Sequence, residues 1–260
     1  MVERNPLKRD QLSLLEATIL PVAGAFSLLI VWQWVLPALG VPAYIVPTPF
    51  SVLRTFASEW RGLIQNALPT WYEALLGFFL GNLTAVILAI VFVYSPRVQA
   101  AYFPVVLLFN TIPVLALAPI IILVFGLGIL PKVVIAALLC FFPTLINMVR
   151  GLTSATSKEL ELMHVLSASG WETFWRLRAP RSVPLLFASL RISATTSVIG
   201  AIVGEWIGSD RGLGAVIIQS TFNYQAERLF AAVLLASLSG IIFFAIVGRI
   251  ERIFHRLASP

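Results

Sequence analysis

The sequence predicts an all-α membrane protein with about six transmembrane helices. Hydrophobic residues make up 59% of the 260 residues, charged residues make up only 12%, and long uncharged runs alternate with short polar segments. Soluble domains carry about 25% charged residues, so this composition excludes a soluble globular domain. With no internal repeat and no low-complexity tract in the sequence, we expect a single transmembrane domain over residues 1–260.

The first apolar stretch has no charged residue from position 17 to position 53. This run is too long for the apolar core of a signal peptide and predicts an uncleaved span over residues 18–39. Three prolines then make residues 40–49 a loop. Thr48 and Pro49 suit the N-cap and first position of a short surface helix over residues 50–60. A second span is expected over residues 67–94.

The third apolar stretch, residues 98–131, is longer than the roughly 20 helical residues that one crossing needs. Prolines interrupt it, so we expect a kinked or broken helix. Asn110, Thr111 and Pro113 form the interruption, either as a structural kink or as part of a transport path, since broken helices at membrane depth face protein or a water-filled cavity.

Three further spans are expected over residues 132–150, 183–207 and 229–248. Residues 209–228 are expected to be a polar loop, with Gly212 and Gly214 as turn residues. With six crossings and a cytoplasmic N-terminus, 13 of the 18 basic residues fall on the inner side. This positive-inside bias assigns both termini, and the polar stretch from Thr156 to Pro184, to the cytoplasm. It also explains the net charge of +6 without nucleic acid binding.

The polar stretch 156–184 predicts two short helices. Thr156 stands three residues before Glu159, and Ser169 three before Glu172, which is the spacing of a capping box. Pro180 is expected to end the second helix. Such a loop either lies on the lipid headgroups or docks into a separate soluble subunit.

The same stretch resembles the cytoplasmic "EAA" loop of bacterial ATP-binding-cassette (ABC) importer permeases. The pattern of that loop is Glu-Ala-Ala, three residues, Gly, nine residues, Ile, one residue, Leu-Pro. Glu161 and Pro180 hold the Glu and Pro positions at the right separation. The chain departs from the pattern at the two alanines, the glycine, the isoleucine and the leucine, where it carries Leu162, Met163, Ser167, Leu177 and Ala179.

Similarity to one importer family extends over nearly the whole chain. The motifs that carry it are Pro47-Thr48-Pro49, Gly77-Phe78 with Gly81, Thr111-Ile112-Pro113, Leu117-Ala118-Pro119, Phe125-Gly126 with Gly128, and Gly212-Leu213-Gly214. They are similar to the permeases of the nitrate, sulfonate and taurine importers. Phe141-Phe142-Pro143 and Ile202-Val203-Gly204-Glu205-Trp206 are most similar to permeases for pyrimidine thiamine precursors (hydroxymethylpyrimidine) or riboflavin.

This resemblance implies the fold of a type I ABC importer permease in the bacterial inner membrane. It implies a permease homodimer, two ATPase subunits that bind ATP and Mg, and an extracellular or periplasmic solute-binding protein. The chain itself would be neither an enzyme nor a cofactor-binding protein. The loop at about residues 151–184 would couple it to the ATPases, through Glu161, Leu162, Met163, Ser167, Gly170, Trp171 and Pro180.

Charged side chains at membrane depth are costly and tend to line interiors. Glu205, followed by Trp206, either reaches water at the outer end of the fifth span or lines an external gate. Arg191 is expected to snorkel to the interface or to pair with a carbonyl, and Glu73 to meet headgroups.

Two other classes of membrane protein make different demands on the sequence. A secondary transporter working without an ATPase would carry internal repeats and functional acids, and a membrane enzyme would need converging catalytic residues. The sequence lacks a P-loop motif, so any ATP would bind to another chain. Cys140 lies in an apolar run and is expected to pack in the core, and His164 and His255 stand without partners at metal-ligand spacing.

Overall fold

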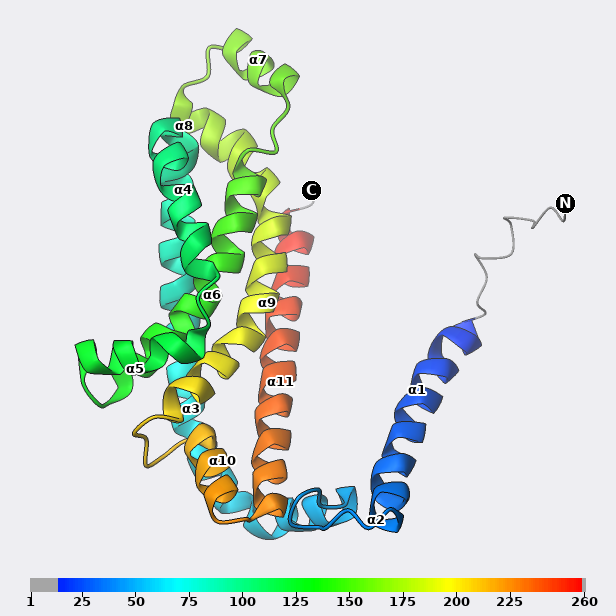
Figure 1. Cartoon of the computed structure of the whole chain (residues 1–260). Coiled ribbons are helices and arrows are strands. Elements are labelled where there is room, and N and C mark those ends of the chain that lie inside the picture. The colour runs from blue at the N-terminus through cyan, green and yellow to red at the C-terminus, as the bar shows by residue number, and fades with distance from the viewer. Residues whose placement is uncertain (1–13, 259–260) are drawn as a thin grey trace, which may run out of the picture.

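The computed structural model describes residues 14–258, in which all regular structure is helical (Figure 1). Five helices are long and apolar enough to cross a membrane, and a sixth crossing results if one bent pair counts as a single span. The predicted all-α class and the predicted number of crossings are therefore confirmed.

The N-terminal span runs as α1 (Leu14–Ile30), a π turn (Val31–Val35) and α2 (Leu36–Ala38), close to the predicted bounds. None of its most apolar window is buried by the rest of the chain, and Figure 1 shows α1 standing apart from the other helices. The Trp32 indole N–H fastens its lower end by donating to the Pro47 carbonyl at 2.9 Å.

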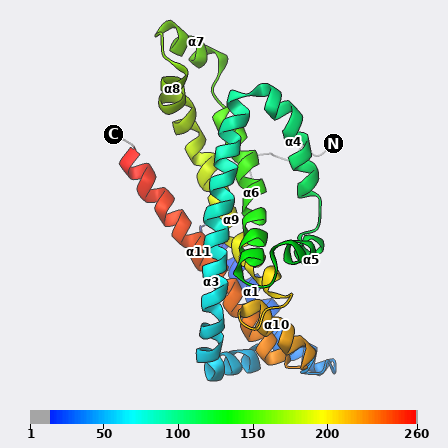
Figure 2. The ribbon, with the colours of Figure 1, turned by 90° about the vertical axis from the view of Figure 1, so that its left-hand side faces the viewer.

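The predicted boundary between a surface helix and the second span is wrong. Helix α3 (Pro49–Tyr94) is continuous over 46 residues, and Figure 2 shows its first turns crossing one end of the bundle before the helix turns upward. Thr48 is the N-cap, as predicted, and its hydroxyl accepts from Ser51 N. Apolar residues such as Val52 and Leu63 are buried on this first segment, so it packs as part of the bundle.

The third apolar stretch is broken, as expected. It forms α4 (Pro96–Asn110) and α5 (Val114–Phe125), which are bent by 103°. The break consists of Thr111, Ile112 and Pro113. Proline has no N–H to continue the helical ladder, which explains why the helix ends there.

Three helices form the centre of the bundle: α3, α6 (Ile129–Leu152) and α9 (Ala179–Glu205). Glycines allow their backbones to approach closely. A Cβ at Gly200 would lie 2.6 Å from the Ala136 Cα, and one at Gly204 would lie 2.8 Å from the Lys132 Cα. Small residues at such contacts are typical of membrane helices. Cys140 is fully buried in this core, as expected.

The C-terminal half differs from the sequence prediction at two elements. Residues 209–228 are not simply a loop, because they contain α10 (Leu213–Phe222), with Leu213, Ala215 and Val216 buried. The last helix, α11 (Ala226–Ala258), is longer than the predicted span because it continues into the charged tail. Its basic turns project beyond the apolar segment, where water can solvate them.

Candidate functional site

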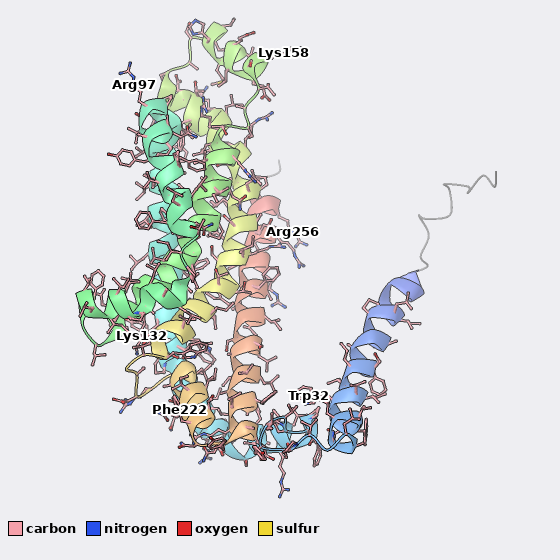
Figure 3. All side chains as sticks on the ribbon, viewed as in Figure 1. Trp32, Arg97, Lys132, Lys158, Phe222 and Arg256 are labelled. Carbon is pink, nitrogen blue, oxygen red and sulfur yellow. The ribbon has the colours of Figure 1, made fainter. Side chains whose placement is uncertain are left out.

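Two polar regions lie at opposite ends of α9 (Figure 1). One is the α7–α8 loop, defined here as residues 153–173, with α7 (Ser157–Val165) and α8 (Gly170–Thr173). The other is the outer polar cluster, defined as Asn66, Thr70, Glu73, Lys132, Glu205 and Ser209. Arg97, Lys158 and Arg256 gather toward the end that carries the α7–α8 loop, whereas Lys132 lies toward the opposite end (Figure 3). This arrangement agrees with the charge distribution expected from the sequence.

Both predicted capping boxes are present in the α7–α8 loop. Thr156 N donates to Glu159 Oε2 at 2.8 Å, and Ser169 N donates to Glu172 Oε2 at 2.9 Å, while each hydroxyl accepts from the backbone N–H of the glutamate. The pKa of Glu159 is lowered from its ordinary value of 4.5. The main cause is that its carboxylate accepts a hydrogen bond from the Thr156 backbone N–H, followed in importance by the bond from the Thr156 hydroxyl and the positive charge of Arg181. These bonds fix the starts of both helices.

The turn between the two helices contains Ser167 in a left-handed conformation, with φ of 53°. Glycine adopts this conformation without the steric penalty that a Cβ brings. Ser167 occupies the position where the resembled loop pattern carries glycine, so the geometry gives a physical reason for glycine there. Serine keeps the turn at some cost in strain.

The α7–α8 loop is attached to the bundle by polar contacts. Arg181 pairs with Glu159 and donates to the Ser154 carbonyl at 3.2 Å, and the Tyr94 hydroxyl donates to the Gly170 carbonyl at 3.1 Å. A motion of this loop would therefore be transmitted to the helices beside it.

Both helices of the loop carry exposed large apolar side chains, and those of α7 lie at helical spacing, with Leu162 three residues before Val165. Val165 is 78% exposed, Leu166 is 66% exposed and Trp171 is 70% exposed. Glu161 and Leu162 are also exposed, whereas Met163 is half-buried. Glu161 has neither a hydrogen bond nor an ion pair with any residue that the structure describes. Contiguous exposed apolar surface marks an interaction site.

Pro180 does not end the second helix, contrary to the sequence prediction. Residues 170–205 form one helical run, in which a π turn (Phe174–Arg178) directly precedes α9. The Ala179 N–H bonds to the Phe174 carbonyl, five residues back. This wider turn changes the hydrogen-bond register just before the proline, which lets the helix continue.

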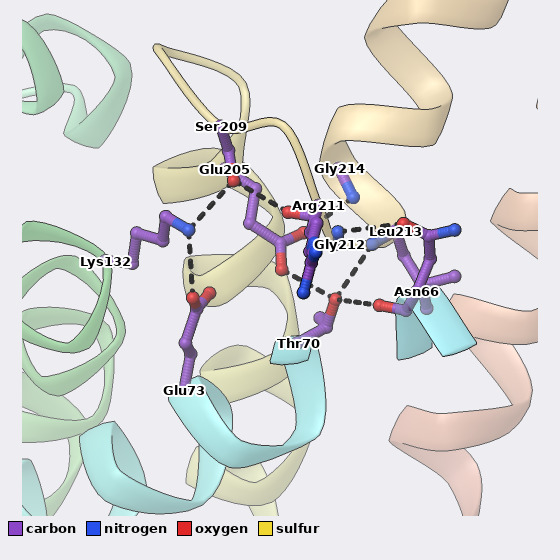
Figure 4. Close-up of polar contacts among 10 residues, drawn as sticks. All are labelled: Asn66, Thr70, Glu73, Lys132, Glu205, Ser209, Arg211, Gly212, Leu213 and Gly214. Carbon is purple, nitrogen blue, oxygen red and sulfur yellow. Dashed lines mark hydrogen bonds and ion pairs between the residues drawn. The ribbon is translucent and has the colours of Figure 1, made fainter. Parts of the chain in front are cut away.

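At the other end of α9, Glu205 is fully buried, so the expectation that its carboxylate reaches water is wrong. Glu205 Oε1 accepts from the Thr70 hydroxyl at 2.7 Å, and Oε2 accepts from Gly214 N at 2.6 Å (Figure 4). Trp206, the next residue, is 36% exposed. The buried carboxylate is thus held at the start of α10, where the helix dipole favours a negative charge.

Glu73 does not meet headgroups either. It is 3% exposed, and its Oε1 accepts from Lys132 Nζ at 3.0 Å. Lys132 also donates to the Ser209 hydroxyl at 2.8 Å, and Ser209 donates to the Arg211 carbonyl at 2.7 Å (Figure 4). Sequence reasoning missed Lys132 and Thr70. The spacing of Thr70 and Glu73 on one helical face was the available signal.

The remaining sequence-predicted residues lie elsewhere. Asn110, Thr111 and Pro113 are exposed at the break between α4 and α5, and within the described residues no hydrogen bond joins them to the outer polar cluster. Arg191 pairs with the carboxylate of Glu251 on α11, and its guanidinium lies 5.7 Å from the Phe244 ring centroid. The partner is therefore a carboxylate rather than the expected carbonyl.

No group of three or more His, Cys, Asp or Glu side chains that could hold a metal ion occurs among the residues that the structure describes. His164 lies in α7, and the side chain of His255 lies outside the described part.

Comparison with known proteins agrees with this architecture. Two curated relatives are permeases: the formylaminopyrimidine transport permease protein ThiX of Halalkalibacterium halodurans, 33% identical over 90% of this chain and 93% of the relative, and the riboflavin transport system permease protein RibX of Chloroflexus aurantiacus, 33% identical over 88% and 86%. A chain of the MetNI methionine ABC transporter, solved in inward-facing conformations, shares the fold with a TM-score of 0.57 and 19% identity, covering 74% of this chain and 94% of that chain.

The family model described as "Binding-protein-dependent transport system inner membrane component" matches residues 77–256. That range begins within α3 and includes the α7–α8 loop and nearly all of α11. The chain therefore belongs to the ABC importer permeases, as a multi-pass inner membrane component of a binding-protein-dependent transport system.

Proposed function

We propose that this permease forms the path of a small solute across the inner membrane and that a separate ATPase drives it by docking on the α7–α8 loop. The observation that carries the proposal is the exposed face of α7, where Val165 and Leu166 are more than half exposed and Glu161, one turn before Val165, has no hydrogen bond or ion pair with any described residue. An apolar patch with a charge at its edge fits a groove in a soluble partner.

The loop is also built to transmit force. Capping boxes at Thr156 and Ser169 fix both helix starts, and the helical run from 170 to 205 continues from α8 into the membrane. A displacement of the docked loop would therefore turn α9 as a rigid rod, which is a common way to convert a local event into a change of domain arrangement.

The full assembly in this proposal contains two copies of the permease, two ATPase subunits that bind ATP and Mg, and a solute-binding protein on the outer side. Both termini and the α7–α8 loop lie in the cytoplasm, as the basic residues indicate. ThiX and RibX are named for formylaminopyrimidine and riboflavin transport. We propose a solute of the same chemical kind, a small nitrogen heterocycle.

Replacing Glu161 with Lys tests the docking of the ATPase. We expect the variant to insert normally and to lose ATP-dependent uptake in reconstituted vesicles, because a reversed charge at the edge of the docking surface is repelled by the partner's groups that attract the carboxylate. The measurements are solute uptake, ATP hydrolysis and the amount of ATPase that co-purifies in detergent.

Asp210→Lys is the matched control, because it makes the same charge change at an exposed position at the opposite end of α9. This variant should retain the co-purifying ATPase. Unchanged uptake by the Glu161→Lys variant, or uptake by the purified permease alone in liposomes, would contradict the proposal. The second result would favour a secondary transporter.

A further inference from the structure

We propose that Glu205 is a positioning residue that makes α10 move as one body with α9, so that movement of the α7–α8 loop reaches the outer end of the protein. The inference rests on the proposed function, because it assumes that an ATPase moves this loop. It concerns a different part of the molecule and adds a role for a buried carboxylate that touches neither the ATPase nor the docking surface.

The first N–H groups of a helix have no partner within the helix. At the start of α10, side chains of other helices supply the partners. Gly212 N donates to Asn66 Oδ1 at 3.2 Å, and Leu213 N donates to the Thr70 hydroxyl at 2.9 Å. Gly214 N donates to Glu205 Oε2 at 2.6 Å. The start of α10 is therefore fixed by α3 and α9.

Glu205 supplies the carboxyl group of this set. It is fully buried, and its carboxylate also accepts from the Thr70 hydroxyl at 2.7 Å. Separating α10 from α9 would leave this buried carboxylate without its hydrogen-bond donor Gly214 N in an apolar environment. The arrangement in which α10 contacts α9 is therefore strongly favoured.

Two glycines provide the room for this contact. A Cβ at Gly212 would overlap the Glu205 carboxylate, and one at Gly214 would lie 2.8 Å from the Glu205 Cβ. Gly212 also has φ of 116°, a conformation that L side chains rarely adopt. The glycines therefore serve the close approach of α10 to Glu205, beyond any role in forming a turn.

The route from the α7–α8 loop to α10 is continuous. Residues 170–205 form one helical run, and Glu205 is the last residue of α9. On the outer side, Lys132 holds the connecting segment through Ser209 at 2.8 Å. Glu205 is thus the residue through which the helical run that begins in the loop is bonded to α10.

Two cysteine reporters test the inference in the permease purified with its co-purifying ATPase. Ile207→Cys reports the end of α9 and Gln219→Cys reports α10, both at exposed positions. The native Cys140 is fully buried. The rate of labelling by a hydrophilic maleimide is measured with and without ATP and vanadate, in the otherwise unchanged protein and with Glu205→Gln added.

In the unchanged protein, ATP and vanadate should alter the labelling of both reporters. Glu205→Gln should reduce the response at position 219 by about five-fold or more, the lower range of typical coupling between sites, while the response at position 207 persists. A purely static stabilising role would leave the responses at 207 and 219 in the same ratio.

Variants of Thr70 keep the test decisive if Glu205→Gln fails to insert. Thr70→Val removes the hydroxyl and should reduce the response at position 219, as Glu205→Gln does. Thr70→Ser keeps the hydroxyl and should retain this response. Thr84→Val is the control, because the Thr84 hydroxyl bonds only to carbonyls of its own helix.

An unchanged response at position 219 in both Glu205→Gln and Thr70→Val would overturn the inference and leave the proposed function standing. If ATP and vanadate alter neither reporter in the unchanged protein, the proposed function fails together with the inference.

Discussion

The two ends of α9 differ in the exposure and the bonding of the side chains around them. At the N-terminal end, Val165 and Leu166 are exposed and Glu161 has no partner in the described chain. At the C-terminal end, Thr70 and Glu205 are fully buried and bonded to one another. The difference separates an exposed surface, which we propose receives a second protein, from a buried cluster whose hydrogen bonds join helices of one chain.

The comparison also separates two kinds of stability. Buried groups at the outer cluster link α3, α6, α9 and α10. Removal of one of these side chains should therefore lower the stability of the whole bundle. The capping-box bonds at the start of α7 are local, so a loss there should affect the loop and leave the bundle intact. Four changes test this contrast.

Lys132→Met should have the largest effect. It leaves the Glu73 carboxylate buried without its cation, which costs about 3–5 kcal/mol for a buried pair. Thermal unfolding of the purified protein in detergent should therefore shift to lower temperature. The double variant Glu73→Gln with Lys132→Met should recover much of the loss, because neither member of this pair then leaves a buried charge without its partner.

The exposed pair of Glu59 and Arg228, at 3.2 Å, is the control for this effect. Surface ion pairs contribute about 0–1 kcal/mol, so Glu59→Gln should barely change the unfolding temperature. Equal losses for Lys132→Met and Glu59→Gln would mean that the outer cluster is no more important to the bundle than a surface contact.

Thr156→Ala should have a smaller and local effect. Loss of an N-cap costs about 0.5–2 kcal/mol, and here it removes the capping box of α7. Amide hydrogen exchange should become faster in residues 157–165 and stay unchanged in α6 and α9. Ser169→Ala is the matched variant, and its effect should be confined to the start of α8.

The α7 capping box should also weaken at low pH. The pKa of Glu159 is lowered in the folded loop because its carboxylate accepts from the Thr156 backbone N–H. A lowered folded pKa stabilises α7 fully above the ordinary value of 4.5, and this contribution is lost as the pH falls through the folded pKa. The protection of the α7 amides, measured against the intrinsic exchange rate at each pH, should fall over that range, and Glu159→Gln should remove the dependence.

Ser167→Gly should have the smallest effect, and it should be stabilising. The left-handed conformation costs a non-glycine residue about 1–2 kcal/mol. Glycine avoids this strain, but it loses about 0.5–1 kcal/mol of stability because its backbone has more freedom in the unfolded chain. Exchange at the turn between α7 and α8 should slow slightly. Faster exchange would indicate that the serine contributes a contact that offsets its strain.

Features that depend on neighbours in the sequence were predictable. Apolar length gave the spans, and the three-residue spacing gave both capping boxes, because a capping box is closed within one helical turn. The broken third stretch followed from Pro113, which cannot continue the helical ladder. The interpretation of the loop needed the resemblance as well, since exposure of Val165 and Leu166 is a property of the folded chain.

The outer cluster was not predictable in the same way. Thr70 and Glu205 are 135 positions apart, and Lys132 and Glu73 are 59 positions apart, so no local pattern joins them. Helix α10 was missed because Gly212 and Gly214 are typical of turns. The reason for these glycines is the room that the Glu205 side chain needs, which only the folded arrangement reveals.

The π turn before Pro180 sets the angular phase between the α7–α8 loop and the membrane-spanning part of α9. A π turn is equivalent to one extra residue in an α-helix, and each residue rotates the chain by about 100°. Deleting one residue between Thr173 and Pro180 would swing the docking face around the helix axis by that amount. The length of this short segment therefore decides the direction in which the loop points.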